Sequence, residues 1–246
     1  MTLDRVLSRF GYASRTVALN AIFSGRVKVN GRVVRDPTIW VSPERDTLHL
    51  DGNRLRPVRR IYLLFYKPKG VITSHGDPEN RTTIYDYLDK TLPWVSPIGR
   101  LDKDTSGLLL LTNDTEFADL VANPASGIPK TYTVKLSGLM DDDAIAALSQ
   151  GVKMKRGDWA RPQSLRRLGD RGKHTWLEVV LTEGKNREVR RMMEAVGFKV
   201  LKLVRIRVGP CSLEGLQVGT WRHLRSGEVS ELKAGRVTVD SAGSKM

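Results

Sequence analysis

The chain has 246 residues, enough for one large domain or two, and 41 Lys and Arg against 27 Asp and Glu give it a formal net charge of +14. So basic a composition favours a polyanionic partner. No apolar run approaches the roughly 18 residues of a membrane span, and the first residues lack the apolar core of a signal peptide, so the sequence predicts a cytoplasmic protein. A single Cys211 and four scattered His fit neither a disulfide framework nor a zinc site, and we expect no metal.

The first 60 residues hold 12 basic and 5 acidic side chains, which is half of the excess charge and indicates a separate basic module. Apolar residues recur at helical spacing over 3–10, and a second helix is predicted from its N-cap Ser14 to Gly25. Residues 26–34 alternate around Asn30-Gly31, which predicts a β-hairpin. The residues expected to face the helices are Val27, Val29 and Val33.

Two short helices and a basic hairpin form a footprint that suits RNA, with an ordinary solvated surface as the alternative. The stretch from Ser14-Arg15-Thr16 through 25–31 resembles the αL RNA-binding motif of the small-subunit ribosomal protein numbered four. This resemblance covers residues 2–50. The cations that we expect to meet phosphates are Arg9, Arg15, Arg26, Lys28 and Arg32.

A polar, basic segment marked by Pro and Gly separates this module from a second domain. We predict an RNA-binding domain over 1–52, a linker over 53–60, a second domain over 61–234 and a disordered tail over 235–246. In the second domain the patterns predict strands over 61–66, 71–74, 107–112, 131–136 and 174–181, and helices over 83–88, 115–121 and 142–150. This irregular mixture predicts an α+β fold.

Asp102 and Asp104 stand directly before an apolar run, 107–112, that predicts a strand buried on both faces. A carboxylate at the edge of a core needs a cationic partner or water. Arg100 would project from the same face as Asp102 in an extended segment, so we expect this pair to keep Asp102 ionised. A solvated turn is the plainer alternative. A calcium loop is disfavoured because Asn113 stands where that loop needs a bidentate Glu.

A second informative segment, 183–197, predicts a helix that Asn186 caps. Arg190 lies at the margin of its apolar face, so the guanidinium can reach inward to a carboxylate. Arg187 and Arg191 point away and are better placed for RNA phosphates, with a solvated cationic helix as the alternative. The segment lacks the spacing of a phosphate-binding loop, which disfavours nucleotide hydrolysis. The apolar face consists of Val189, Met192, Met193 and Val196.

Together these segments resemble the RsuA type of pseudouridine synthase, in the branch that includes the large-subunit rRNA enzymes. The resemblance spans nearly the whole chain, and the Gly-Arg-Leu-Asp block with its leucine run is highly specific. It implies a small N-terminal αL RNA-binding domain followed by a catalytic domain with a mixed, mainly antiparallel sheet. The matching motifs are the αL module, 67–70, 99–102, 105–114, 130–132 and 184–192.

The resemblance also implies roles for individual side chains. Asp102 would be the catalytic carboxylate that acts at the ribose of a uridine, so that the base detaches, turns and reattaches through carbon, and Arg190 would be its basic partner. Arg100 would hold the target nucleotide out of its helix, Tyr132 would stack on the uracil, and Leu203 would line the pocket. No cofactor is implied. Further RNA contacts are expected from Lys185, Arg187 and Arg191.

The sequence of residues 186–192 resembles the large-subunit enzymes more than the small-subunit enzyme. We therefore expect the substrate to be a uridine in 23S rRNA, with 16S rRNA as the alternative. A non-catalytic ribosome-assembly protein that binds RNA is the alternative to an enzyme. We expect a monomer that acts on rRNA or on an assembly intermediate in the cytoplasm.

Overall fold

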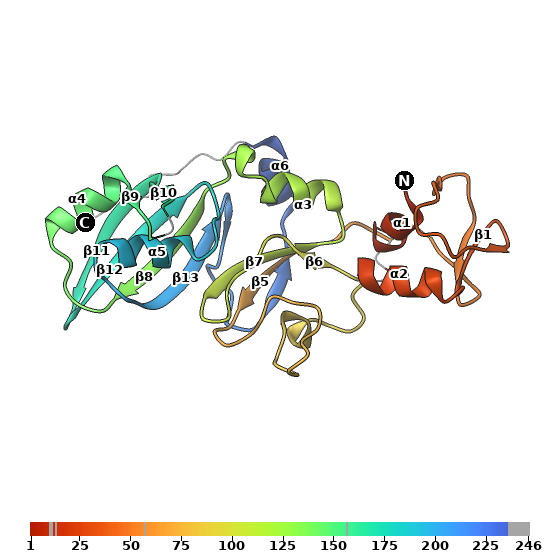
Figure 1. The fold of residues 1–246 in the computed structure, drawn as a ribbon, viewed down its shortest axis with the longest axis horizontal. Helices are drawn as coiled ribbons and strands as arrows, with labels where there is room; N and C mark the ends of the chain where they lie inside the picture. Colours follow the sequence, from red (N-terminus) through yellow and green to blue (C-terminus); the bar gives the residue numbers. More distant parts are fainter. Residues whose placement is uncertain (10–11, 13, 57, 156, 236–246) are drawn as a thin grey trace.

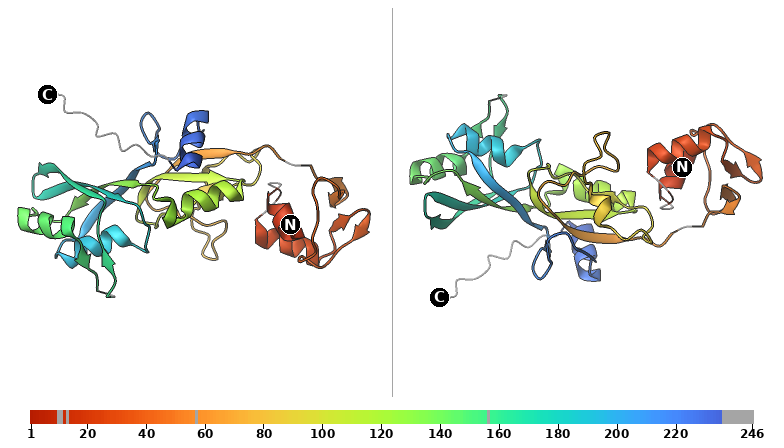
Figure 2. Two further views of the ribbon diagram at one scale, coloured as in Figure 1. Left: turned by 90° about the horizontal axis from the view of Figure 1, so that it is seen from above. Right: turned by 90° about the horizontal axis from the view of Figure 1, so that it is seen from below.

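The computed structural model describes residues 1–9, 12, 14–56, 58–155 and 157–235. The chain forms two folded units that follow one another along the long axis of the molecule (Figures 1 and 2). The predicted end of the first helix at Phe10-Gly11 and all but the first residue of the predicted tail lie outside the described residues. None of the described helices is long and apolar enough to cross a membrane.

The first unit packs two helices against a small antiparallel sheet with the strand order β2-β1-β3-β4. Ser14 caps the second helix as predicted, because its Oγ accepts a hydrogen bond of 3.3 Å from the N–H of Val17. Leu3, Ile22 and Val27 are completely buried in its core. The elements are α1 (Leu3–Arg9), α2 (Arg15–Phe23), β1 (Val27–Val29), β2 (Arg32–Val33), β3 (Leu48–Leu50) and β4 (Asn53–Arg54).

The predicted hairpin forms around Asn30-Gly31, and both turn residues have positive φ, 50° and 83°. Its register pairs Lys28 with Val33. Since paired residues point to the same side of a sheet, Val33 shares the outward face of Lys28 and is 46% exposed. The prediction that Val33 faces the helices is therefore wrong, and Val34 packs against the core instead.

The first unit extends past its predicted boundary at residue 52. Strand β4 lies inside the predicted linker, 53–60, and pairs with β3 so that Arg54 stands opposite His49. Leu55 is 7% exposed and packs in the core of the first unit. The connection between the two units is therefore shorter than predicted.

The second unit is built on a nine-stranded sheet with the main order β11-β12-β8-β13-β7-β5-β15. Short strands β14 and β6 pair with β13 and β7. Neighbouring strands are antiparallel, apart from β13 and β7, which are parallel. The predicted mixed, mainly antiparallel sheet is confirmed. The strands are β5 (Tyr62–Lys67), β6 (Ser96–Pro97), β7 (Ser106–Thr112), β8 (Lys130–Leu136), β11 (Ser164–Arg171), β12 (His174–Leu181), β13 (Val200–Val208), β14 (Cys211–Ser212) and β15 (Trp221–His223).

Helices and a short hairpin, β9–β10, cover this sheet (Figure 1). The predicted helix over 83–88 is a 3-10 turn, and the predicted strand over 71–74 is present as an isolated bridge from Ile72 to Thr83. The covering elements are α3 (Thr115–Ala122), α4 (Asp142–Gln150), α5 (Glu188–Ala195), α6 (Ser226–Ala234), η1 (Ile84–Tyr87), η2 (Pro124–Ser126), β9 (Val152–Lys153) and β10 (Trp159–Ala160).

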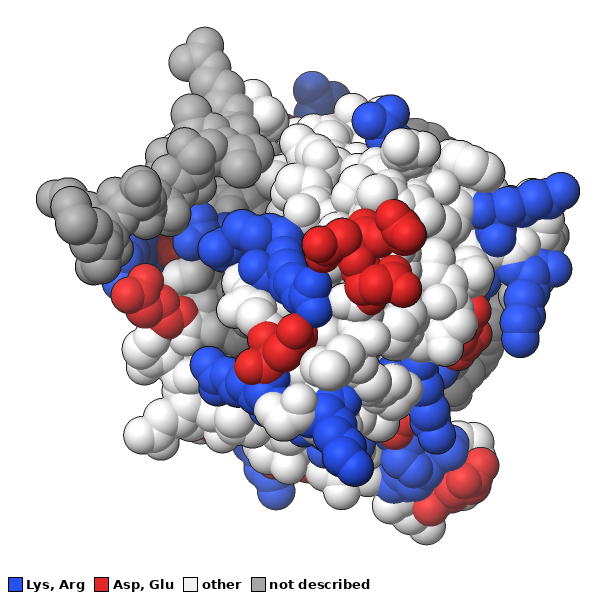
Figure 3. All heavy atoms as spheres, turned by 90° about the vertical axis from the view of Figure 1, so that its left-hand side faces the viewer, with Lys and Arg blue, Asp and Glu red and all other residues white. Residues whose placement is uncertain are grey.

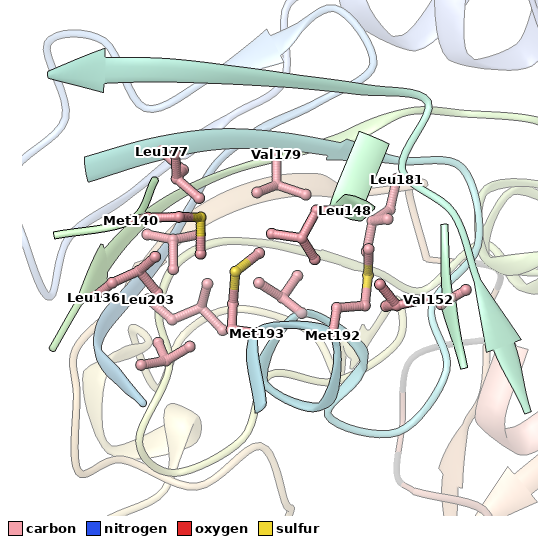
Figure 4. Close-up of a cluster of buried hydrophobic side chains, with 14 of the residues drawn as sticks. Leu136, Met140, Leu148, Val152, Leu177, Val179, Leu181, Met192, Met193 and Leu203 are labelled. Carbon is pink, nitrogen blue, oxygen red and sulfur yellow. The ribbon is translucent and has the colours of Figure 1, made fainter. Parts of the chain in front are cut away.

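Helix α5 is anchored by the apolar face that its spacing predicts. Met192 and Met193 are completely buried, and Figure 4 shows them between the helix and the strand that carries Leu177, Val179 and Leu181. The helix begins at Glu188 after Arg187, which has a φ of 49° and provides no side-chain cap. The prediction of Asn186 as the cap is therefore wrong.

Strand β7 is buried on both faces, as its leucine run predicts. Leu108 and Leu110 pack against helices α3 and α6, whereas Leu109 and Leu111 belong to the cluster on the opposite face, over η1. Gly107 has a φ of 123°, and a Cβ built on it would lie 2.3 Å from the carbonyl oxygen of Arg205. Glycine at this position lets β13 run directly beside β7.

Candidate active site

A cavity of about 640 Å³ opens where β7 begins, beside β8, β13 and the loop before α5. Alternate residues of two neighbouring strands line it, Lys130 and Tyr132 on β8 and Leu203 and Arg205 on β13. The volume lies in the range of small-ligand pockets. The sequence-predicted site residues that line the cavity are Arg100, Asp102, Tyr132, Lys185, Arg187 and Leu203.

The turn that carries Asp102 is held in place by hydrogen bonds to its main-chain atoms. Lys67, completely buried at the end of β5, donates from Nζ to the carbonyl oxygens of Asp102 at 3.1 Å and Thr105 at 2.9 Å. The N–H of Leu101 donates to Oγ1 of Thr73 at 3.3 Å, and the same hydroxyl donates to the Leu101 carbonyl at 2.9 Å. All of these bonds are made to backbone atoms of the turn and none to the Asp102 carboxylate. The carboxylate is left facing the cavity, and 36% of the Asp102 side chain is exposed.

Lys67 is a positioning residue that sequence reasoning missed, because 67–70 was noted only as a matching motif. Burial lowers the pKa of Lys67 to about 8, and the negative charges of Asp102 and Asp104 oppose that shift. The alternation Leu63, Phe65, Lys67 could have revealed it, since both apolar residues are completely buried on the same face of β5.

The cation paired with Asp102 is Arg187, whose Nη1 lies 3.7 Å from Oδ2 of Asp102. Arg187 stands at the N-terminal end of α5 and was predicted to point toward RNA phosphates instead. Arg100, the expected partner, is exposed at the cavity wall. Asp102 pairs with Arg187 because the loop before α5, distant in sequence, packs beside the Asp102 turn. The spacing of residues within 100–102 carries no information on that packing.

Arg190 reaches inward from α5, as predicted, but its guanidinium ends on the backbone. Nη2 donates to the carbonyl oxygen of Asp104 at 3.0 Å, and Nη1 donates to that of Val200 at 3.2 Å. Burial lowers the pKa of Arg190, the charge of Arg187 lowers it further, and Asp104 and Asp102 oppose both effects. The expected contact with a carboxylate is replaced by a contact with the turn that carries Asp102.

Two cations of the α5 segment bind the β9–β10 hairpin. Arg191 forms an ion pair with Asp158, and its side chain is 15% exposed. Lys185 donates from Nζ to the carbonyl oxygen of Trp159 at 3.1 Å and pairs with Glu183 at 2.9 Å. In this structure the Arg191 guanidinium is directed to the hairpin, and its contact with RNA phosphates stays a prediction.

Lys130 and Arg205 add two cations to the cavity wall that sequence reasoning missed. Lys130 donates from Nζ to the carbonyl oxygen of Thr182 at 3.1 Å, and Arg205 donates from Nε to that of Leu108 at 2.7 Å. Burial lowers the pKa of Lys130, the charge of Arg205 adds to this effect, and Glu188 opposes it. The signal was a period of two, because each cation is two residues from an expected site residue on the same strand.

A carboxyl pair, Glu183 and Glu188, lines the same cavity. Glu188 is 3% exposed, and its Oε2 accepts a hydrogen bond of 3.0 Å from the N–H of Lys185. Burial raises the pKa of Glu188 to about 7, and a side-chain hydrogen bond with Glu183 supports this shift. The same interaction lowers the pKa of Glu183, so the proton of the pair resides on Glu188 below about pH 7.

Replacing Glu188 with Gln is expected to stabilise the protein above pH 7 and to have little effect near pH 5. The folded chain keeps a proton on Glu188 up to about pH 7, whereas the unfolded chain releases it near 4.5, so wild-type stability falls as pH rises through this window. Thermal unfolding of both proteins at pH 5 and 8 measures the effect. Glu214→Gln, at an exposed position, is the control. A variant whose melting temperature differs from wild type equally at both pH values would contradict the assignment.

Arg187→Gln and Arg190→Gln are expected to act differently. Loss of Arg187 removes an exposed charge next to Asp102, so kcat should fall about tenfold while the melting temperature changes little. Loss of Arg190 removes the donor from the buried Val200 carbonyl and from the part-buried Asp104 carbonyl, and should lower stability by about 2–3 kcal/mol as well as activity. Paired kinetics and denaturant unfolding distinguish them, and the reverse pattern would make Arg190 the partner of the carboxylate.

Four of the cations expected to meet phosphates, Arg15, Arg26, Lys28 and Arg32, lie on the surface of the first unit, and two of them are paired. Nε of Arg15 donates to Asp4 at 2.6 Å, and Nε of Arg26 donates to Asp51 at 2.8 Å. Lys28 and Arg32 are exposed on the hairpin. Arg9 ends helix α1, and its side chain lies outside the described residues.

The cavity joins a half-exposed carboxylate, an aromatic ring and several cations, a combination suited to a nucleotide with its anionic backbone. No group of three or more His, Cys, Asp or Glu among the described residues is arranged to hold a metal ion. Residues 61–195 match the family model described as RNA pseudouridylate synthase, and residues 1–43 match the S4 domain. The chain belongs to the RNA pseudouridylate synthase family and is therefore an isomerase.

Similar proteins span nearly the whole chain. A ribosomal large subunit pseudouridine synthase B of Bacillus subtilis is 38% identical over 94% of this chain and 95% of its own length. An uncharacterized RNA pseudouridine synthase of Aquifex aeolicus is 39% identical over 94% of this chain and 92% of its own. A crystal structure of a pseudouridylate synthase superposes with a TM-score of 0.68 at 29% identity, covering 94% of this chain and 99% of that one. The resemblance predicted from the motifs is confirmed.

Proposed function

We propose that this chain converts one uridine of 23S rRNA to pseudouridine, with Asp102 as its catalytic carboxylate. The observation that carries the proposal is the Asp102 side chain, held by its backbone at the wall of a cavity that Tyr132 and Arg100 also line. The similarity to proteins named for the large ribosomal subunit supports the choice of RNA. The proposed setting is a cytoplasmic monomer.

The proposed reaction moves the uracil from a nitrogen link to a carbon link. Asp102 acts at the ribose as the bond from C1′ to N1 of the base breaks. The base then turns, C5 bonds to C1′, the C5 proton leaves and N1 gains a proton, so atoms balance without a co-reactant. Arg187 faces the carboxylate and stabilises its charge.

Binding of an extruded uridine would draw on the other cavity residues. Extrusion costs a few kcal/mol of stacking, and a base stacked on Tyr132 would recover about 1–3 kcal/mol. Arg100 would hold the flipped nucleotide from the rim. Lys67 and Arg190 would act as positioning residues, because both bind carbonyl oxygens of the turn around Asp102.

The RNA path would follow unpaired cations and leave the far end of the catalytic unit free. Figure 3 shows that end, where basic and acidic side chains lie next to each other. Arg166 pairs there with Glu178 at 3.0 Å, and Arg167 pairs with Asp142 at 3.1 Å. Such a neutralised surface attracts a phosphate backbone less than the exposed Lys28 and Arg32 of the S4 domain would.

Carbodiimide-stop sequencing of rRNA from cells with and without the gene tests the proposal. Loss of one pseudouridine signal in 23S rRNA is the expected result. Loss of a signal in 16S rRNA would keep the activity and overturn the choice of RNA. An unchanged pattern in both rRNAs would favour a role in ribosome assembly or a different RNA substrate.

A further inference from the structure

Trp40, in the S4 domain, is the most exposed of the large apolar side chains in the described part of the chain, at 81%. Its two neighbours in sequence are directed differently, since Val41 is 4% exposed and Ile39 packs against the core of the unit. An exposed Trp presents a large, flat aromatic face with a polar N–H, and Trp is enriched at surfaces where proteins bind other molecules. Neither the cavity nor the catalytic proposal uses Trp40.

The backbone of Trp40 is fixed. Trp40 forms an antiparallel bridge with Thr2, flanked by hydrogen bonds from the Leu3 N–H to the Ile39 carbonyl at 3.0 Å and from the Val41 N–H to the Met1 carbonyl at 2.9 Å. These two bonds make Thr2 and Trp40 a non-hydrogen-bonded pair, the kind whose side chains stand closest together on one face. The indole is therefore presented on a fixed backbone, which lowers the ordering cost of binding.

A cation is held on the same side of the domain. The Thr2 side chain hydrogen-bonds the Asp4 carboxylate. Asp4 in turn accepts a hydrogen bond of 2.6 Å from Nε of Arg15, whose side chain is 64% exposed while that of Asp4 is 4% exposed. This chain of contacts runs from Trp40 through Thr2 and Asp4 to Arg15. Because Arg15 binds Asp4 through Nε, its terminal nitrogens are available to a second anion.

We propose that Trp40 is a stacking platform for an unpaired base of the RNA substrate and that Arg15 contacts a phosphate next to that base. The inference rests on the RNA-directed activity of the chain and adds a base contact to a module otherwise expected to bind phosphates. The charge of the first 60 residues, 12 basic against 5 acidic, suits RNA and opposes the pairing of two copies of this face. Stacking tolerates any base, so the platform adds affinity for unpaired segments and little sequence choice.

The test measures binding of the full chain to an oligouridylate of about 20 nucleotides, over a series of salt concentrations. Trp40→Ala should weaken binding about 5- to 100-fold, and Trp40→Phe should retain most of the affinity. The slope of log affinity against log salt should stay unchanged for Trp40→Ala, since stacking displaces no counterion, whereas Arg15→Gln should reduce its magnitude by about one. Circular dichroism and thermal unfolding verify that each variant is folded.

Phe23→Ala is the matched control, because Phe23 is an exposed aromatic residue of the same unit, at 58%. It should leave binding unchanged. Equal losses for Phe23→Ala and Trp40→Ala, or full affinity in Trp40→Ala, would overturn the proposal. Sedimentation velocity that shows a dimer for wild type and a monomer for Trp40→Ala would also overturn the proposal, because Trp40 would then serve self-association. The comparison of Trp40 variants with wild type keeps Asp102 unchanged, so a wrong catalytic assignment would leave this result unaffected.

Discussion

Asp102→Asn is expected to lower the rate of pseudouridine formation by at least about three orders of magnitude while leaving RNA affinity and folding nearly unchanged. The turn is held through carbonyl oxygens, which asparagine retains, so Lys67 can still donate to residue 102. The lost ion pair with Arg187 joins two partly exposed side chains at 3.7 Å and is worth about 0–1 kcal/mol. Loss of activity therefore would report chemistry and not collapse of the turn.

The assay is single-turnover conversion of an in vitro transcribed 23S rRNA fragment, run beside a filter-binding measurement of affinity for the same RNA. Asp104→Asn is the matched control, since this exposed residue belongs to the same turn and offers its carbonyl to Arg190 in either form. Asp104→Asn should retain activity within about tenfold. Comparable losses in both variants would mean that the turn as a whole matters and that Asp102 has no special role.

Regular elements with a strong local signal were predictable. Strand β12 and helix α4 have the predicted bounds, 174–181 and 142–150, and the leucines of β7 are buried on both faces. Where the structure differs, a pairing partner decided the outcome. Val33 faces solvent because a two-residue turn places it opposite Lys28, and β4 forms because β3 is available to pair with it.

The composition of the site was more predictable than its contacts. The family resemblance placed Asp102, Tyr132 and Leu203 at one site, and all three line the same cavity. Which arginine meets which oxygen depends on how α5 packs against the turn, and local spacing carries no information on that packing. Arg187 therefore reaches the carboxylate of Asp102, the contact expected of Arg190, whereas Arg190 binds the backbone of Asp104.

Gly107→Ala is expected to destabilise the catalytic unit by about 3–5 kcal/mol, more than its small change in volume suggests. Its Cβ would lie 2.3 Å from the carbonyl oxygen of Arg205 and 2.5 Å from the amide nitrogen of the same residue. Since the Cβ would meet backbone atoms of Arg205, no side chain can rotate away, and β13 must separate from β7. The φ of 123° adds strain for any residue with a side chain.

Gly169→Ala separates these two causes, because Gly169 has the same φ of 123° and no atom within 4 Å of its built Cβ. Its cost should be the conformational strain alone, about 1–2 kcal/mol. Urea unfolding followed by tryptophan fluorescence gives both values. Equal losses would mean that φ, and not the approach of β13, demands glycine at position 107. Strand β7 follows the Asp102 turn, and β13 carries Leu203, which lines the cavity. A larger loss of stability for Gly107→Ala, together with a fall in activity, would therefore support the conclusion that the parallel pairing of β7 and β13 holds Asp102 and Leu203 in position relative to each other.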